Sequence, residues 1–206
     1  MKVYFVRHGE STFNAGRIHQ PSDSALSEFG KKQAEYVGIR LKNIDIDVFL
    51  SSPIPRARQT AEIINTSLNK EIIYTDFLQE IKHPSEFVGK DYLDPFVKEV
   101  EKSRFENADN DTWHYSDEEN FFELKTRVKK LLGFLDEFEG KNILAVTHGN
   151  FLRVIFSIMM LGQEVNNTEL EKIHYFLKTI NTGITICEKE GGQWKLLTWN
   201  DHSHLG

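Results

Sequence analysis

Short apolar runs alternate with helix-length segments along most of this chain, and this alternation restricts the folds open to it. The runs typical of strands are 1–6, 46–51, 71–75 and 142–147, and helices are predicted over about 27–42, 55–67, 117–138 and 149–160. Strands separated by helices form largely parallel sheets that are covered on both faces. The sequence therefore predicts an α/β fold, a three-layer α/β/α sandwich with a mostly parallel sheet.

The end of the chain follows a different pattern. Segments 183–189 and 193–199 read as strands, and they are joined by Glu190-Gly191-Gly192. Two such runs around a short glycine-containing turn predict an antiparallel hairpin at the sheet edge. The chain has 206 residues and no repeat, low-complexity tract or linker. We therefore expect one domain over 1–206, with an irregular and helical insert at about 82–122.

Two strand-like runs are each followed by a histidine and a glycine, His8-Gly9 and His148-Gly149. In α/β sheets, ligands bind at the carboxyl ends of the strands. A glycine after each histidine lets the backbone turn sharply and approach a ligand closely. One histidine of this kind is more often a structural hydrogen-bonding group. Two of them, each directly after a strand-like run, predict a ligand-binding site.

A third segment, Ser51-Ser52-Pro53 followed by Arg56, comes after the strand-like run 46–51. Serine and proline are favourable at a helix start, so Arg56 is expected on a first helical turn at the same end of the sheet. Arg7 precedes His8 directly. Two guanidinium forks, two imidazoles and a helix N-terminus suit a dianion, because guanidinium binds phosphate oxygens in pairs. The expected ligand is a phosphoryl group.

These segments resemble the histidine phosphatase superfamily, which contains the cofactor-dependent phosphoglycerate mutases. The resemblance is strong over 1–62 and 141–154 and weak over about 82–118, and it rests on Arg7-His8-Gly9-Glu10-Ser11 with Asn14, Leu26-Ser27-Glu28-Phe29-Gly30 with Gln33-Ala34, Ser51-Ser52-Pro53 with Arg56 and Gln59-Thr60-Ala61, and Thr147-His148-Gly149. It implies a phosphoglycerate mutase-like fold and a phosphoric monoester hydrolase of the histidine acid phosphatase type.

The resemblance also implies roles for individual residues. A neutral imidazole of His8 attacks phosphorus and forms a phosphohistidine that water then hydrolyses. Arg7, Arg56 and His148 are expected to stabilise the equatorial oxygens. With Asn14 and Gly149 added, the expected phosphate-binding residues are Arg7, Asn14, Arg56, His148 and Gly149. No cofactor is expected. No metal is expected either, because the sequence lacks spacings typical of metal ligands.

A proton donor for the leaving oxygen is the remaining requirement. Glu80 lies in Phe77-Leu78-Gln79-Glu80-Ile81 and matches the Leu-x-Glu element of the superfamily. We interpret Glu80 as the general acid, with a solvated loop carboxylate as the alternative. Glu10 is expected to orient Arg7 or to cap its loop.

The insert is the most individual part of the chain. Segment 82–122 contains eight aromatic residues among eleven acidic and five basic ones, and this excess of six negative charges equals the net charge of the protein, −6. Two interpretations stay open. Either the insert is a lid whose aromatic side chains contact the organic part of the substrate, or it is a helical insert that packs them into the core.

Hydrolysis is favoured over transfer, because the mutases of this superfamily carry an extra basic insert, whereas the corresponding region here is acidic. Gln20-Pro21-Ser22-Asp23 also departs from the mutase pattern. We expect a metal-independent hydrolase of a small-molecule phosphomonoester. The alternatives are a phosphoglycerate mutase-type phosphotransferase, a phosphoprotein-directed phosphatase and a binding module.

The composition of the chain limits the partners and the cellular location that we expect for it. A net charge of −6 without a basic stripe argues against nucleic-acid binding. No apolar run is long enough for a membrane span or a signal-peptide core, and the single cysteine, Cys187, has no partner for a disulfide. We expect a cytoplasmic protein without membrane association. The oligomeric state stays open, with a homodimer as one possibility. The histidines at 19, 83, 114 and 174 have no context that indicates function.

Overall fold

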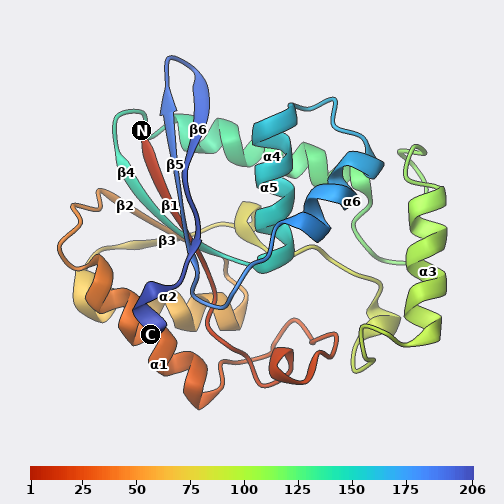
Figure 1. The fold of residues 1–206 in the computed structure, drawn as a ribbon, viewed down its shortest axis with the longest axis horizontal. Helices are drawn as coiled ribbons and strands as arrows, with labels where there is room; N and C mark the ends of the chain where they lie inside the picture. Colours follow the sequence, from red (N-terminus) through yellow and green to blue (C-terminus); the bar gives the residue numbers. More distant parts are fainter.

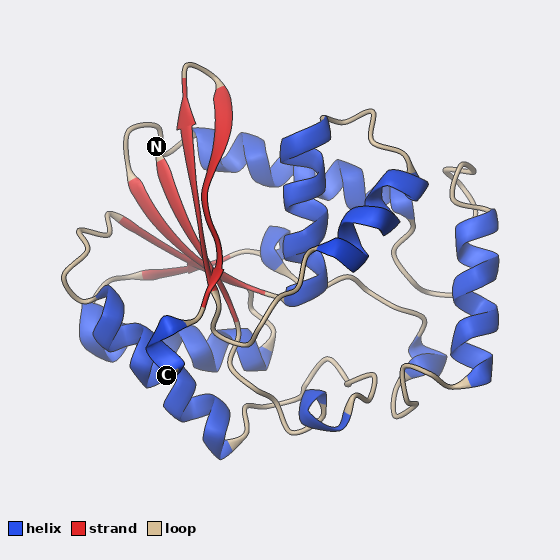
Figure 2. Cartoon of the chain, in the orientation of Figure 1, coloured by secondary structure: helices blue, strands red, loops and turns tan.

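The computed structural model describes all 206 residues and contains a six-stranded sheet between layers of helices (Figures 1 and 2). The strand order is β3-β2-β4-β1-β5-β6. β1 to β4 are parallel to one another, whereas β5 is antiparallel to both β1 and β6. The bounds are β1 Lys2–Arg7, β2 Val48–Ser51, β3 Ile72–Tyr74, β4 Asn142–Thr147, β5 Ile184–Glu190 and β6 Gln193–Asp201. The predicted mostly parallel α/β sandwich with an antiparallel edge hairpin is confirmed.

The helices divide between the two faces of the sheet, with α1 and α2 on one side and α4 and α5 on the other (Figure 1). Their bounds are α1 Glu28–Leu41, α2 Pro55–Leu68, α3 Pro95–Glu106, α4 Phe121–Asp136, α5 Gly149–Leu161 and α6 Asn167–Phe176. α4 begins later than predicted, because Asn120 caps its first turn in a capping box with Glu123. None of the helices is both long and apolar enough to cross a membrane.

Alternation along the strands fills a core on each face of the sheet. In β1, Val3 and Phe5 belong to a cluster of 18 buried residues with α4 and α5, whereas Tyr4 and Val6 belong to a cluster of 12 with α1 and α2. Successive strand residues point to opposite faces, so one strand supplies both cores. The carboxyl end of β1 is thereby fixed from two sides.

The insert packs largely apart from these two cores, and α3 lies away from the sheet (Figure 1). Phe87, Val97 and Val100 form a separate cluster of three buried residues, with Phe96 packed against it. Other aromatic side chains of this region are exposed to solvent, namely Tyr92, Phe105, Tyr115 and Phe122. Most of the aromatic side chains of the insert therefore do not enter the main core. Its role as a lid stays a prediction.

Candidate active site

The carboxyl ends of three adjacent strands place His8, Ser52 and His148 side by side. β2, β4 and β1 are neighbours in the sheet, and backbone pairing with β4 continues one residue past the ends of β1 and β2. The His8 amide donates to the Thr147 carbonyl at 2.9 Å, and the Ser52 amide donates to the Val146 carbonyl at 3.0 Å. The His8 and His148 rings lie 5.1 Å apart between centroids. The structure thus brings together the two histidines that the sequence singled out.

His8 has the protonation state that a nucleophile needs. Its Nδ1 lies 2.7 Å from the Gly9 carbonyl oxygen, and because a carbonyl can only accept, Nδ1 carries the proton. Burial, reinforced by the charges of Arg56 and Arg7, lowers the pKa of His8 well below its ordinary value. Nε2 is buried and has no hydrogen-bond partner. The ring is therefore neutral, with the lone pair of Nε2 free.

Two guanidinium groups beside His8 also lack partners. Arg7 Nη1 donates to the Thr179 carbonyl at 2.9 Å, but its Nε is buried and unpartnered. Arg56 lies in the first turn of α2, is 3 % exposed, and leaves both Nε and Nη1 without an acceptor. Burial lowers the pKa of both groups. Buried cations without a carboxylate partner are costly, so this arrangement is suited to an anionic ligand.

His148 completes the same group of donors. Its Nε2 lies 2.9 Å from the Ser52 hydroxyl, and its Nδ1 is buried without a partner. Burial, and then the charge of Arg56, lowers the pKa of His148 well below its ordinary value. With the Ser52 hydroxyl donating to Nε2, the proton of the neutral ring lies on Nδ1. His148 then presents a neutral N–H donor.

Glu80 lies against the first turn of α5. Its carboxylate accepts from the backbone amides of Phe151 at 2.8 Å, Ile81 at 3.0 Å and Asn150 at 3.3 Å. Arg127 donates to the neighbouring Gln79 carbonyl at 2.8 Å and helps to fix the segment. Glu80 is thus an ordered part of the site rather than a solvated loop carboxylate.

Asn14 supports the loop that carries His8. Its Nδ2 donates to Asn181 Oδ1 at 3.0 Å, and Asn181 Nδ2 in turn donates to the His8 carbonyl at 3.0 Å. Asn14 Oδ1 accepts from the Ser11 hydroxyl at 2.8 Å. One N–H of the Asn14 amide has no acceptor in this network. Its predicted contact with phosphate stays a prediction, and Asn181 is a supporting residue that sequence reasoning missed.

Glycines hold the His8 loop against α1. A Cβ added to Gly9 would lie 2.4 Å from the Gly30 carbonyl oxygen, and one added to Gly30 would lie 2.0 Å from the Glu10 carbonyl oxygen. The Glu10 carboxylate accepts from the Ser27 hydroxyl at 2.8 Å. Of the two expectations for Glu10, the structure favours capping of the loop. No hydrogen bond or ion pair joins Glu10 to Arg7, because its side chain turns to the start of α1.

Gly149 is also required for close packing. A Cβ at this position would lie 2.9 Å from the Thr179 hydroxyl and 3.0 Å from Arg7 Nε. A side chain here would therefore displace Arg7, one of the cations of the site. The expected phosphate contact of Gly149 stays a prediction.

The insert reaches the site through one loop. The Tyr92 amide donates to the Arg17 carbonyl at 3.2 Å, and the His19 amide donates to the Lys90 carbonyl at 2.9 Å. Tyr92 packs on His19 with ring centroids 4.6 Å apart. Tyr92 is 41 % exposed, and the partial burial of its side chain raises its pKa, whereas the charge of Arg7 opposes this shift. The sequence carries no local signal for this contact.

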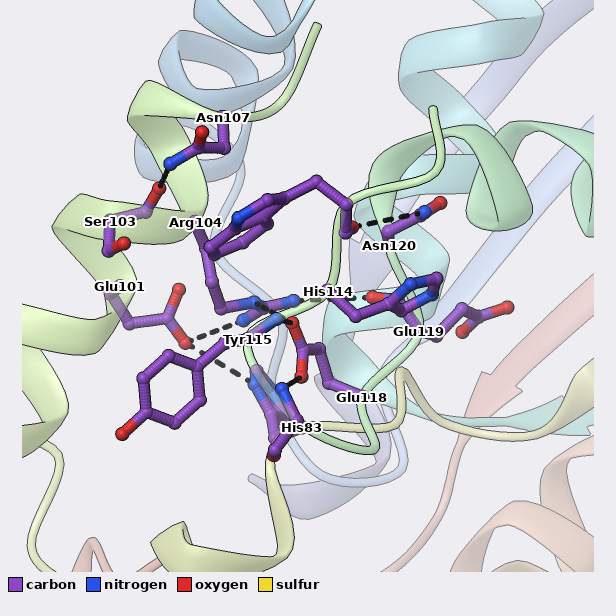
Figure 3. Close-up of polar contacts among 12 residues, drawn as sticks. His83, Glu101, Ser103, Arg104, Asn107, His114, Tyr115, Glu118, Glu119 and Asn120 are labelled. Carbon is purple, nitrogen blue, oxygen red and sulfur yellow. Dashed lines mark hydrogen bonds and ion pairs between the residues drawn. The ribbon is translucent and has the colours of Figure 1, made fainter. Parts of the chain in front are cut away.

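Part of the negative charge of the insert is paired with basic side chains of the insert itself (Figure 3). Arg104 contacts Glu101 at 2.8 Å and the buried Glu118 at 3.7 Å, and His83 lies 3.5 Å from Glu101. Glu118 also accepts from the Tyr115 amide at 2.7 Å. The acidic residues are therefore partly structural.

The histidines without sequence context include three near the site. The His19 and His83 rings lie 5.3 Å apart, and burial together with His83 lowers the pKa of His19 to about 4. His174 Nε2 lies 2.9 Å from Arg153 Nη1. Their positions depend on where the insert and α6 return to the sheet, which no local pattern encodes.

The polar groups of the site are mainly nitrogen donors. No group of three or more His, Cys, Asp or Glu residues is arranged to hold a metal ion. Cys187 is buried in β5, and burial raises the pKa of its thiol to about 12. Guanidinium and imidazole groups around a single carboxylate are suited to a phosphoryl group.

The chain is similar to known proteins over nearly its whole length. The family described as "Histidine phosphatase superfamily (branch 1)" matches residues 3–202. A metal-independent phosphoserine phosphatase of Arabidopsis thaliana is 30 % identical over 209 residues, covering 99 % of this chain and 83 % of that protein. A probable phosphoglycerate mutase GpmB of Erwinia tasmaniensis is 30 % identical over 213 residues, covering 100 % and 95 %. The structure of Bacillus stearothermophilus YhfR superposes with a TM-score of 0.82 at 25 % identity, covering 100 % and 99 %.

Proposed function

We propose that this chain, which belongs to the histidine phosphatase superfamily (branch 1), hydrolyses a small phosphomonoester through a phosphohistidine and without a metal ion. Relatives similar to this chain are named phosphatases and phosphoglycerate mutases. One observation carries the proposal. Five buried polar atoms without partners surround the end of β1, namely Arg7 Nε, His8 Nε2, Arg56 Nε and Nη1, and His148 Nδ1. They offer one nucleophile and several donors to a tetrahedral dianion.

In the first step, His8 Nε2 attacks phosphorus in line with the ester oxygen. The P–N bond forms as the P–O bond breaks, and the ring becomes a cationic phosphohistidine whose Nδ1–H stays bonded to the Gly9 carbonyl. Arg7 and Arg56 stabilise the charge on the three equatorial oxygens. The leaving alkoxide takes a proton from Glu80.

In the second step, water attacks the phosphohistidine. The Glu80 carboxylate accepts a proton from this water as the new P–O bond forms and the P–N bond breaks. Inorganic phosphate leaves, and His8 and Glu80 return to their starting states. One residue thus acts first as the acid and then as the base.

The class of substrate is drawn from the relatives. One is named for phosphoserine and another for phosphoglycerate, so a small phosphorylated metabolite is the proposed substrate class. The alternatives are a mutase-type phosphotransferase and a phosphoprotein-directed phosphatase or binding module. Release of inorganic phosphate from small esters distinguishes hydrolysis from transfer, and a binding module would release none. A cytoplasmic location, a single domain and the oligomeric state stay open predictions.

The proposal is tested by trapping the intermediate. The enzyme is mixed briefly with a 32P-labelled ester and quenched without acid, and we expect label on His8. His8→Ala should remove the label, whereas the matched control His202→Ala, which changes an exposed histidine, should keep it. Turnover of 4-nitrophenyl phosphate should survive a chelator and be inhibited by orthovanadate. Label on a serine or aspartate, or strict dependence on a divalent ion, would contradict the mechanism.

A further inference from the structure

α5 contains a single charged residue, and the proposed chemistry does not use it. The helix reads GNFLRVIFSIMML, and eight of its residues are buried. Arg153 has no carboxylate partner, whereas arginines 40, 58, 104 and 127 each form an ion pair. Its Nε is buried and has no hydrogen-bond partner. A charge held this way on an apolar helix is costly unless an anion binds it.

The other contacts of Arg153 are all neutral. Nη1 lies 3.3 Å from Asn150 Oδ1 and 2.9 Å from His174 Nε2, and Nη2 lies 3.3 Å from the Thr179 hydroxyl. Burial, and then the charge of Arg153, lowers the pKa of His174 to about 4, so its ring is neutral at pH 7. Because Nε2 accepts from Arg153, the ring proton lies on Nδ1. Arg153 therefore keeps its Nε–H without an acceptor, while the neutral His174 ring holds the Nη1 edge of the guanidinium in place.

Thr179 and Asn150 place this pair beside the phosphate donors. The Thr179 carbonyl accepts from Arg7 at 2.9 Å, and its hydroxyl accepts from Arg153. Asn150 contacts Arg153 with its side chain and donates to Glu80 with its amide at 3.3 Å. Arg153 therefore lies next to both Arg7, which is expected to bind the phosphate, and Glu80, the proposed acid. If Glu80 protonates the leaving oxygen, as the proposed function has it, the alcohol part of the substrate lies on this side.

We propose that Arg153, held in place by His174, forms a second anion subsite, which binds a carboxylate on the alcohol part of the substrate. The inference rests on the proposed function, because it assumes that the phosphate is transferred to His8. A phosphate dianion balances Arg7 and Arg56. With Glu80 protonated, Arg153 leaves one positive charge, which matches a carboxylate and its paired oxygens rather than a second phosphate. The substrate class is then a phosphorylated hydroxy or amino acid.

The test compares esters that differ only in this group. Three pairs replace the carboxylate by a hydroxymethyl group: phosphoglycolate with ethylene glycol phosphate, 3-phosphoglycerate with glycerol 3-phosphate, and O-phosphoserine with serinol phosphate. We expect the wild type to prefer the carboxylate in at least one pair by about tenfold or more in kcat/KM, chiefly through KM. Arg153→Gln should bring this ratio close to one.

Matched variants separate the subsite from a general loss of charge. Arg58→Gln removes an exposed arginine that pairs with Glu62 on α2, and it should leave the ratio unchanged. Arg153→Lys keeps the charge without the fork and should retain part of the preference. His174→Gln should lower the ratio less than Arg153→Gln does, and it serves as the second variant if Arg153→Gln fails to fold by circular dichroism.

Failure of the inference can be told from failure of the proposed function. If the wild type forms labelled His8 and hydrolyses 4-nitrophenyl phosphate, but no pair shows a carboxylate preference, only the subsite is overturned. An unchanged ratio in Arg153→Gln overturns it as well, and so does a preference for glycerol 1,3-bisphosphate over 3-phosphoglycerate. If no ester is hydrolysed and His8 carries no label, the proposed function falls and the subsite with it.

Discussion

The cluster of His8, Arg56 and His148 and the insert are built in contrasting ways. His8, Arg56 and His148 lie at the ends of strands or on the first turn of a helix, and each is at most 3 % exposed. The insert has its own cluster of three buried residues and exposes several aromatic side chains. The sheet therefore fixes the positions of these side chains, whereas the insert packs around a small cluster of its own. In the proposed function the first region would carry the reaction, and the role of the insert as a lid stays a prediction.

The largest expected difference between the two regions is in turnover. His8→Ala should reduce kcat by about 10⁴-fold or more, because no other group supplies the nucleophile. Phe105→Ala, at an exposed aromatic of α3, should change kcat by less than about threefold. Steady-state rates with 4-nitrophenyl phosphate measure both. Appreciable activity in His8→Ala with an intact circular dichroism spectrum would remove His8 as the nucleophile.

The global free energy of unfolding should also depend more on the main core than on the insert. Leu131→Ala, in the main core, should lower the global free energy of unfolding by about 2–5 kcal/mol. Phe87→Ala, in the separate cluster, should chiefly speed hydrogen exchange over residues 82–120 and leave global unfolding little changed. Urea denaturation and exchange mass spectrometry make the comparison. An equal global loss for both variants would mean that the insert unfolds together with the sheet.

The next effect separates the acid from the phosphate donors. Glu80→Gln should slow hydrolysis of alkyl phosphates by about a hundredfold, and nitrophenyl phosphate much less, because a phenolate leaves without a proton. Arg56→Ala should damage both esters alike, since it stabilises the transferring group. The measurement is kcat/KM for both variants on both esters. Equal losses for Glu80→Gln would move the acid role to Glu10 or to a carboxylate of the insert.

The smallest expected effect is a pH dependence of stability with opposite signs in the two regions. His8 and His148 stay neutral in the folded protein because burial lowers their pKa values. Below pH 6.5 the unfolded chain binds protons that the folded chain does not, so each residue lowers the free energy of unfolding by at most about 1.4 kcal/mol per pH unit. The hydrogen bond to Glu123 raises the pKa of His114. The small amount by which His114 stabilises the folded state is therefore present in acid and is lost as pH rises.

Urea titrations between pH 7.5 and 5 test this dependence. His8→Asn should reduce the slope of the free energy of unfolding against pH by at most about 1.4 kcal/mol per pH unit. His114→Asn should make the decline slightly steeper, because it removes a group that stabilises the fold in acid. A free energy of unfolding that does not change with pH over this range would contradict the neutral state of the buried histidines.

The clustering of these site residues could be predicted because it depends on one rule. Residues that follow parallel strands meet at one edge of the sheet, so Arg7, His8 and His148 were expected together. Arg56 followed from the helix start after β2. Glu80 came only from the family resemblance, because its contact with α5 depends on the path of a loop. The fold class followed in the same way from the alternation of strands and helices.

The rest of the site depends on tertiary contacts that no local pattern encodes. Thr179, Asn181 and His174 reach the site because the chain returns from α6 to β5 past the end of β1. Two features of the sequence could have pointed to the start of α6 and to Arg153. Asn166 and Glu169 form the capping box that starts α6, and Arg153 is the only charge in an apolar helix.

The close contact between Gly9 and Gly30 affects how mutational data on this protein should be interpreted. A side chain at Gly30 would strike the backbone of Glu10 and shift the loop that carries the nucleophile. A substitution scan scored by activity would therefore rank Gly30 alongside His8, although Gly30 lies in α1 and touches no reacting group. An active site mapped from such a scan would extend into a helix whose part is to hold the loop in place.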